Sequence, residues 1–311
     1  MHLRNVEIFC DTVVHRSFSK AAGARGISQP AVSQAIQQLE ERLGLTLIDR
    51  SKRPLELTPA GHVYYDGCRK LLDDFREVEE RVQELNGRVI GRIRIAAIYS
   101  IGLLQMSEYV QEFESRHPEV DLRVEYLHPD EVYSRVRRDE ADFGLVSFPR
   151  DGGDVASIPW QHQEMGLVVP PRHPLAGQAL RKLADLQGAR FVGFTPDLTI
   201  RRETDRLLKK HRVSVELVHE FDNIENIKRA VEIGAGAAIL PLATVRREVD
   251  SGLLVAVHFQ DVQFVRPLGI IHKRHKHLSM AAERFVQLLC EELGSESPAT
   301  SGGRKPTAAT A

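Results

Sequence analysis

Hydrophobic positions near the start of the chain recur at helical spacing in three short stretches. The first stretch has one apolar face, formed by Val6, Phe9, Cys10, Val13 and Val14. Ser17 precedes the second stretch as a candidate N-cap. Ser28 and Pro30 open the third, which ends at Gly44. Three short helices are therefore predicted.

Alternating apolar residues follow this helical region. They occupy 45–48 and 55–57, on either side of a basic segment that includes Arg50, Lys52 and Arg53. Alternation of this kind predicts two short strands with a positively charged tip, which is the arrangement of a wing.

Apolar residues then alternate at spacings of four and three. They are Tyr64, Cys68, Leu71, Phe75, Val78, Val82 and Leu85. This period predicts one long helix, and charged residues fill most of its other positions. A helix packed on its own domain has the same period, but alternation sustained over three heptads favours a seam between two copies of the helix.

Beyond residue 92 the pattern changes to alternating strands and helices. Candidate strands lie at 93–98, 120–127, 142–148, 163–169, 190–194, 214–219, 236–240, 253–258 and 265–272. Candidate helices lie at 102–116, 130–139, 197–211, 223–233, 241–250 and 278–293. Two such blocks predict two α/β subdomains, each with a parallel sheet, and a cleft between them.

Composition narrows the class of protein. The chain has 311 residues, 42% hydrophobic and 27% charged, which is typical of a soluble globular protein with several domains. Its net charge of −1 means that any surface for nucleic acid has to be local. Three cysteines without paired spacing favour a reducing compartment, and we find neither a signal-peptide core nor a membrane-length apolar run. We therefore expect a cytoplasmic protein without a membrane partner.

Short motifs occur in a fixed order along the chain. The N-terminal ones are SFSKAA at 17–22, SQPAVS at 28–33, LEERLG at 39–44, LIDR at 47–50 and LTPAG at 57–61. The later ones are DFGLV at 142–146, HPLA at 173–176 and GAGAAILP at 234–241. Together they resemble the LysR-type family of bacterial transcription regulators over nearly everything before residue 294. The chain departs from the family at Arg25, Ala35 and Ile48, and Ala35 removes a polar side chain expected near the DNA.

The resemblance implies an α/β multidomain protein with three functional parts. They are a winged helix-turn-helix DNA-binding domain at 1–58 (helix-turn-helix about 18–37), a dimerisation linker helix at 59–88 and an effector domain at 92–293. The effector domain is expected to have a periplasmic-binding-protein-like fold, with subdomain I at about 92–161 and 266–293 and subdomain II at about 162–265. The tail, 294–311, is rich in Ser, Gly, Pro, Thr and Ala and is expected to be disordered.

The resemblance also implies partners. We expect double-stranded promoter DNA with a partly palindromic site, a small-molecule effector, and self-association as a homodimer or homotetramer, with RNA polymerase as a further candidate. A helix in the major groove reads base edges with short polar groups near its start. The expected DNA contacts are Gln29, Pro30, Ser33 and Gln34 on the third helix and Arg50 and Arg53 on the wing. The alternative is that these polar residues are merely exposed to solvent, as polar residues on a helix usually are.

Effector contacts are expected where strands end and helices begin, because open parallel sheets bind ligands there. The candidates are Tyr99, Ser100, Ile101, His128, Ser147, Phe148, Thr195, Thr199 and Asn223. Ser100, Thr195, Thr199 and Asn223 fit plain helix caps equally well, and a solvated loop histidine is the alternative for His128. Arg201 and Arg202 are compatible with an anionic effector, although charged surface is the usual explanation.

An enzyme built on the α/β region is the alternative class. Gly234 and Gly236 suggest a nucleotide-binding loop, but Ile239 stands where the third glycine is required. The S-x-x-K match at 17–20 lies in the DNA-binding region without the companion motifs. Basic residues interrupt the histidines at 272–277, which argues against a metal site. We therefore expect no catalytic residues, metal or cofactor.

Overall fold

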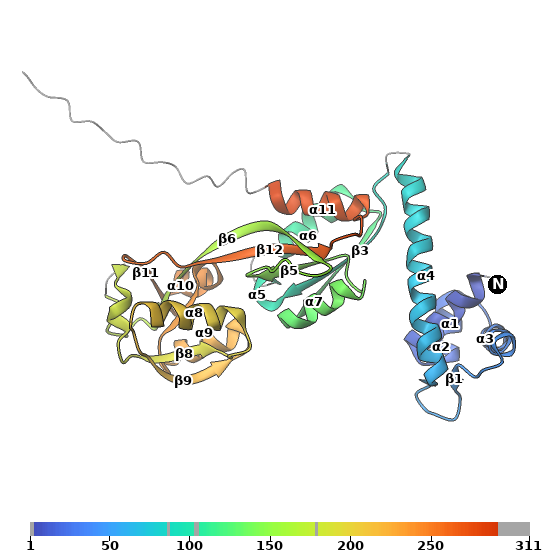
Figure 1. Ribbon diagram of the computed structural model, residues 1–311, viewed down its shortest axis with the longest axis horizontal. Helices are drawn as coiled ribbons and strands as arrows, with labels where there is room; N and C mark the ends of the chain where they lie inside the picture. The colour runs from blue at the N-terminus through green and yellow to red at the C-terminus, as the bar shows by residue number, and fades with distance from the viewer. Residues whose placement is uncertain (1–2, 86–87, 103–105, 178–179, 292–311) are drawn as a thin grey trace, which may run out of the picture. The chain divides into compact units, whose positions relative to one another are not determined.

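The computed structural model describes residues 3–85, 88–102, 106–177 and 180–291 (Figure 1). The chain divides into two units, Met1–Arg88 and Val89–Ala311. The predicted disordered tail lies outside the described residues. No helix among the described residues is both long and apolar enough to cross a membrane.

The first unit begins with three short helices. They are α1 (Leu3–His15), α2 (Phe18–Arg25) and α3 (Gln29–Leu43). Ser17 and Ser28 cap α2 and α3, each accepting a hydrogen bond from a backbone N–H three residues later. Gly26 and Gly44 end the same helices in the left-handed conformation, at φ 64° and 66°, which glycine adopts without steric cost.

A small antiparallel ribbon and a long helix complete this unit. The ribbon pairs β1 (Ile48–Asp49) with β2 (Glu56–Leu57), and the helix is α4 (Pro59–Glu84). Their shared core is fully buried and apolar, and it includes Val6, Phe9, Ala21, Val32, Ile36, Leu39, Leu47 and Ile48.

The core of the first unit corrects three expectations. Val14 was placed on the apolar face of the first helix, but it is 64% exposed. Cys68 and Tyr64 were placed in a seam between two helices, but they pack on the core of their own unit, where the Tyr64 ring meets Phe9 edge-on. The long helix ends at Glu84 rather than at 88.

The second unit alternates strands and helices. Its strands are β3 (Gly91–Ile98), β4 (Val120–Leu127), β5 (Phe143–Ser147), β6 (Val155–Val169), β7 (Leu180–Arg181), β8 (Arg190–Phe194), β9 (Glu216–Phe221), β10 (Ala238–Pro241), β11 (Val255–Phe259) and β12 (Val265–Lys273). Its α-helices are α5 (Tyr99–Gly102), α6 (Met106–Arg116), α7 (Pro129–Arg137), α8 (Thr199–Lys210), α9 (Ile224–Glu232), α10 (Arg246–Asp250) and α11 (Met280–Glu291). Short 3₁₀ turns occupy Leu183–Leu186 and Leu242–Val245.

The sheet is mixed rather than parallel. The order of its strands is β4-β3-β5-β12-β6-β11-β7, and β10 also pairs with β6. Strands β3, β4 and β5 are mutually parallel, whereas β12 runs antiparallel to both β5 and β6. Strands β8 and β9 form a separate parallel pair. The parallel prediction therefore holds for β3, β4 and β5 of the first block and for the pair β8–β9 of the second. It is wrong for β10, β11 and β12, which all pair antiparallel with β6.

Two apolar cores lie along this sheet. The first gathers β3, β5, α6, α7 and α11, and the second gathers β8, β10, α8 and α9. The chain passes from one core to the other on β6, between Trp160 and Met165, and returns at the start of β12, between Phe264 and Leu268. Figure 1 shows these two strands side by side, with β12 paired along the first part of β6, from Val155 to Glu164.

Candidate DNA interface and effector site

Helix α3 separates its side chains onto two faces. Val32, Ala35, Ile36 and Leu39 are buried against α1 and α2. Gln29, Pro30 and Gln34 are exposed on the other side, and Ser33 is half-buried beside them. The start of this helix therefore presents amide and hydroxyl groups outward. Ala35 does not lie on that face, so the expected loss of a polar group near the DNA is wrong.

Arg50 is held in place at the base of the wing. Its guanidinium pairs with Glu40 Oε2 at 2.7 Å and lies over the Phe18 ring, 5.6 Å from the centroid. Glu40 Oε1 also accepts hydrogen bonds from the backbone N–H groups of Leu47 and Ile48, at 2.8 and 3.2 Å. One carboxylate thus positions both β1 and Arg50, a role that the sequence pattern did not reveal.

The tip of the wing carries the second predicted arginine. Arg53 is exposed and donates from Nη1 to the carbonyls of Arg50 and Lys52, at 3.3 and 3.2 Å. Asp49 accepts from the Ser51 hydroxyl and N–H, which lowers the pKa of its carboxyl. The wing is therefore closed by its own hydrogen bonds, with the cationic groups at its surface.

Arg25, which departs from the family pattern, is the last residue of α2. It forms ion pairs with Glu7, at 2.9 Å, and with Asp11. These pairs tie α2 to α1 through charge.

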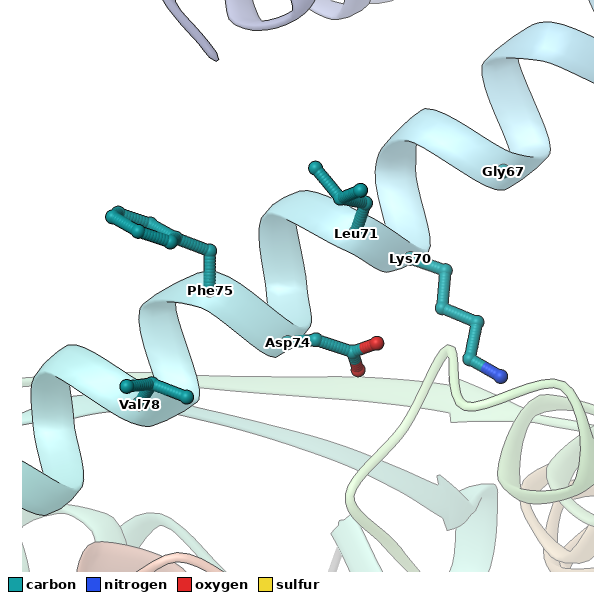
Figure 2. Close-up of a pocket in the computed structure, with 6 residues that line it drawn as sticks. All are labelled: Gly67, Lys70, Leu71, Asp74, Phe75 and Val78. Carbon is teal, nitrogen blue, oxygen red and sulfur yellow. The ribbon is translucent and has the colours of Figure 1, made fainter.

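Helix α4 has an apolar surface beyond the part that packs on the core. A shallow groove there is lined by Gly67, Lys70, Leu71, Asp74, Phe75 and Val78. Figure 2 shows Leu71 and Phe75 projecting from the same side of the helix. Leu71, Phe75, Val78 and Val82 are each between 44% and 57% exposed. These four residues are called the α4 stripe below.

The predicted effector residues after β3 fall in a short helix rather than a loop. Tyr99 is 49% exposed, whereas Ile101 is 2% exposed and belongs to the first core. Ser100 lies between them, and its hydroxyl accepts a hydrogen bond from Arg266 Nη2 at 2.9 Å. The Ile101 side chain is therefore a core residue, not a ligand contact.

Two side-chain contacts join the first and second blocks of this unit. His128 Nε2 lies 3.0 Å from Asp197 Oδ2, between the loop after β4 and the loop after β8. Arg150 Nη2 donates to Thr199 Oγ1 at 2.9 Å. The pKa of Asp197 is lowered, first by the Thr195 hydroxyl and also by His128. The structure thus brings His128, Thr195 and Thr199 into one region.

The remaining predicted residues have local structural partners. Phe148 has φ 49°, donates its N–H to the Pro267 carbonyl at 2.8 Å and packs on the second core. Ser147 pairs with Leu268 in the sheet. Asn223 caps α9 by accepting from the Asn226 N–H at 2.9 Å. Thr195 lies near Asn223, because its N–H donates to the carbonyl of Phe221 at the end of β9, at 3.0 Å.

The arginine pair on α8 is occupied by groups of the protein itself. Arg201 forms ion pairs with Asp205, at 2.9 Å, and with Glu220. Arg202 donates to the Asp197 carbonyl and to Thr199 Oγ1, at 2.8 and 2.9 Å. These contacts favour the surface-charge alternative for both residues.

Two buried polar residues were missed by the sequence analysis. Arg266 on β12 is 2% exposed, and Gln163 on β6 is 7% exposed and lies directly opposite it in the sheet. A charged residue at the start of a strand is usually exposed to solvent. Nothing in the sequence pattern indicated that Arg266 is buried.

Candidate metal ligands are not grouped in the described ranges. Over those residues, no three His, Cys, Asp or Glu side chains lie close enough to hold a metal ion together.

Comparison with known proteins identifies both parts of the chain. Residues 3–62 match the family model "Bacterial regulatory helix-turn-helix protein, lysR family", and residues 86–294 match "LysR substrate binding domain". A probable RuBisCO transcriptional regulator of Cyanidioschyzon merolae is 31% identical over 92% of this chain and 96% of its own length. The RuBisCO operon transcriptional regulator of Allochromatium vinosum is 27% identical over 93% and 96%.

A solved structure shares the fold. The Corynebacterium glutamicum OxyR C206 mutant superposes with a TM-score of 0.71 at 20% identity, over 94% of this chain and 93% of the other. The structure agrees with both matched family models. The first unit has the capped helices and wing of a DNA-binding domain, and the second has an α/β fold with two cores. The chain therefore belongs to the LysR family and is a DNA-binding transcriptional regulator with an effector-binding domain.

Proposed function

We propose that the protein recognises its promoter with the outer face of α3, through Gln29, Pro30, Ser33 and Gln34. The observation that carries this assignment is the division of α3 into a buried apolar face and a polar exposed face at its N-terminal end. Gln side chains can bond adenine in bidentate fashion, and Pro30 can contact a thymine methyl. Arg50 and Arg53 then contact phosphates or the minor groove from the wing.

The test is footprinting of the full chain on DNA of its own genome at two salt concentrations. Gln29→Ala and Ser33→Ala are each expected to weaken binding to the protected site about tenfold, because a good base contact contributes about 1–3 kcal/mol. Gln111→Ala, an exposed glutamine on α6, is the matched control and keeps full affinity. Unchanged affinity and selectivity in both α3 variants would contradict the assignment.

We further propose the domain assignments. Residues 1–58 form the DNA-binding domain, 59–88 the dimerising linker, and 92–293 the effector domain. Subdomain I comprises 92–161 with 266–293, and subdomain II comprises 162–265. Support comes from the two cores, between which the chain passes at Trp160–Met165 and Phe264–Leu268.

A small molecule is proposed to bind between the subdomains, near Tyr99, Ser100, His128, Ser147, Phe148, Thr195, Thr199 and Asn223. Contacts across this region, His128 with Asp197 and Arg150 with Thr199, support a site that depends on how the subdomains are placed. The effector can change DNA binding only if it binds one arrangement more tightly than another.

These assignments also bear on how the protein acts, in which compartment, and in which oligomeric state. We propose that the protein acts by binding rather than by catalysis, in the cytoplasm, as a dimer through α4 or a tetramer. Support comes from its family and from the exposed α4 stripe.

A further inference from the structure

Arg266 is a buried cation without a buried anion. Its side chain is 2% exposed, and its Nη2 donates to Ser100 Oγ at 2.9 Å. Its Nε has no hydrogen-bond partner among the described residues. Burial lowers the pKa of the guanidinium to about 9, which still leaves it charged near neutral pH.

Gln163 supplies a second unsatisfied group at the same place. It pairs with Arg266 across the antiparallel β6–β12 ladder, so the two side chains stand on the same face of the sheet. Within the described part of the chain, Gln163 Oε1 is buried without a partner. A flip of the amide exchanges its oxygen and nitrogen, so this residue can present a donor as readily as an acceptor.

Without a bound partner, an unpaired buried charge and an unpaired buried amide both lower the stability of the folded protein. A buried charge is normally neutralised by a partner, and a buried polar group is normally hydrogen-bonded. Lys228, another buried cation among the described residues, follows that rule, because it pairs with Glu225 and Glu248 at 2.6 and 2.8 Å. Arg266 has no such ion pair with any described residue, and its hydroxyl partner carries no charge.

We propose that Arg266, Ser100 and Gln163 form an oxyanion-binding centre, and that the effector carries a carboxylate or phosphate group that pairs with the Arg266 guanidinium. The inference rests on the proposed effector site, to which Ser100 belongs. A guanidinium offers its N–H groups in a fork that matches the oxygens of either group. The Nε–H group, which has no partner among the described residues, supplies a donor to the oxyanion beside the Nη2 group that Ser100 already engages.

The location of this centre connects binding to the arrangement of the domain. Gln163 and Arg266 lie where β6 and β12 pass between the two cores, and Ser100 follows β3 of the first core. An anion bound there contacts both connecting strands. Its binding energy can therefore differ between two placements of the cores, as control by a ligand requires.

The experiment measures anion-dependent stabilisation of the full chain. Thermal unfolding is followed with inorganic phosphate, with acetate, and with neutral acetamide, at constant ionic strength set by chloride. A ligand that binds only the folded state stabilises it by RT ln(1 + L/Kd), where L is the ligand concentration, and so raises the Tm as that concentration increases. We expect phosphate, acetate or both to raise the Tm, with acetamide and chloride inactive. A response to phosphate alone assigns a phosphorylated effector, and a response to acetate alone assigns a carboxylate.

Arg266→Met is the decisive variant. It is expected to unfold at a higher Tm than the parent without anion, because it removes an unpaired buried charge, and to lose the anion response. Gln163→Leu, which keeps the arginine, is expected to weaken the response. Arg123→Met, an arginine with a 70% exposed side chain on β4, is the control and keeps the response.

Three outcomes would overturn the inference. They are the absence of any oxyanion response in the parent, an unchanged response in Arg266→Met, and, if that variant does not fold, an unchanged response in Gln163→Leu. Footprinting of the same preparation separates this result from the proposed function. A protected site without an anion response refutes only the oxyanion centre, whereas an anion response without a protected site refutes the DNA assignment.

Discussion

At the scale of single residues, Glu40 links the reader helix to the wing. Its side chain is 13% exposed and accepts hydrogen bonds from two backbone N–H groups of the β1 segment and from Arg50. Without this carboxylate, the two N–H groups of Leu47 and Ile48 would lose their acceptor in a partly buried site. An unsatisfied buried donor costs more free energy than an average hydrogen bond contributes.

Glu40→Ala is therefore expected to lower the free energy of unfolding by about 2 kcal/mol, because charge-assisted hydrogen bonds are lost from a partly buried position. Urea denaturation monitored by circular dichroism measures this change. Glu41→Ala is the matched control, since Glu41 is exposed and its carboxylate accepts from Gln37, one turn earlier on the same helix. Both replacements introduce the strongest helix former, so helix propensity does not separate them. Equal stability of the two variants would refute the role of Glu40.

The sequence predicted burial correctly where helical periodicity alone determines which face of a helix is buried. It failed where the burial of a side chain depends on residues far away in the sequence. The division of α3 into Val32 and Ile36 inside and Gln29 and Gln34 outside follows from a period of 3.6. The burial of Arg266 depends on Ser100, far away in sequence, and no local pattern contains that contact.

At the scale of elements, α4 divides between two roles. Its N-terminal part packs Cys68 and Leu72 into the core of the first unit, at 5% and 4% exposure. The α4 stripe begins with Leu71 and remains exposed within the unit. An apolar stripe at heptad spacing with charged flanks is what a helix–helix dimer buries. The heptad pattern runs without a break from the core-packed part of α4 into the α4 stripe. The pattern alone therefore does not show where packing on the core of the same chain ends.

Leu71→Asp combined with Phe75→Asp is expected to convert the dimer into a monomer. Both side chains project from the same side of α4, and a charge in a buried helix–helix seam without a partner is strongly destabilising (Figure 2). Sedimentation velocity measures the oligomeric state, and circular dichroism verifies that the helices are retained. Val63→Asp, at a 78% exposed apolar position of the same helix outside the stripe, is the control and stays dimeric. A double variant that still sediments as a dimer would rule out the stripe as the interface.

The sheet shows a similar limit of sequence patterns. Helices α8 and α9 fall within the stretches predicted from their apolar period. Strand β6 begins at Val155 rather than at 163, because its first half carries Pro159 and several polar residues that hide the alternation. Its pairing with β12 is nonlocal, and this antiparallel pair converts two predicted parallel blocks into one mixed sheet.

At the scale of the whole molecule, the proposed dimerisation through α4 would couple the positions of two DNA-reading helices. Helices α3 and α4 belong to the same unit, and both contribute to its core. A dimer formed through α4 therefore sets a fixed separation between two copies of α3. Two readers held in this way bind half-sites whose centres are about 10 base pairs apart or a multiple of that distance.

The spacing of the two half-sites is consequently a test of the complete assignment. Inserting about five base pairs between them turns one half-site to the opposite side of the duplex, whereas inserting about ten restores its orientation. The half-turn insertion is expected to weaken binding roughly 100-fold, because the second reader then loses its high effective concentration. A full-turn insertion should restore part of this loss. Gel-shift titrations of the three operators provide the affinities. The Leu71→Asp, Phe75→Asp variant is expected to bind all three equally weakly, since a monomer has no second reader to misplace. Equal affinities for the parent protein would mean that its two readers act independently, and that α4 does not fix their separation.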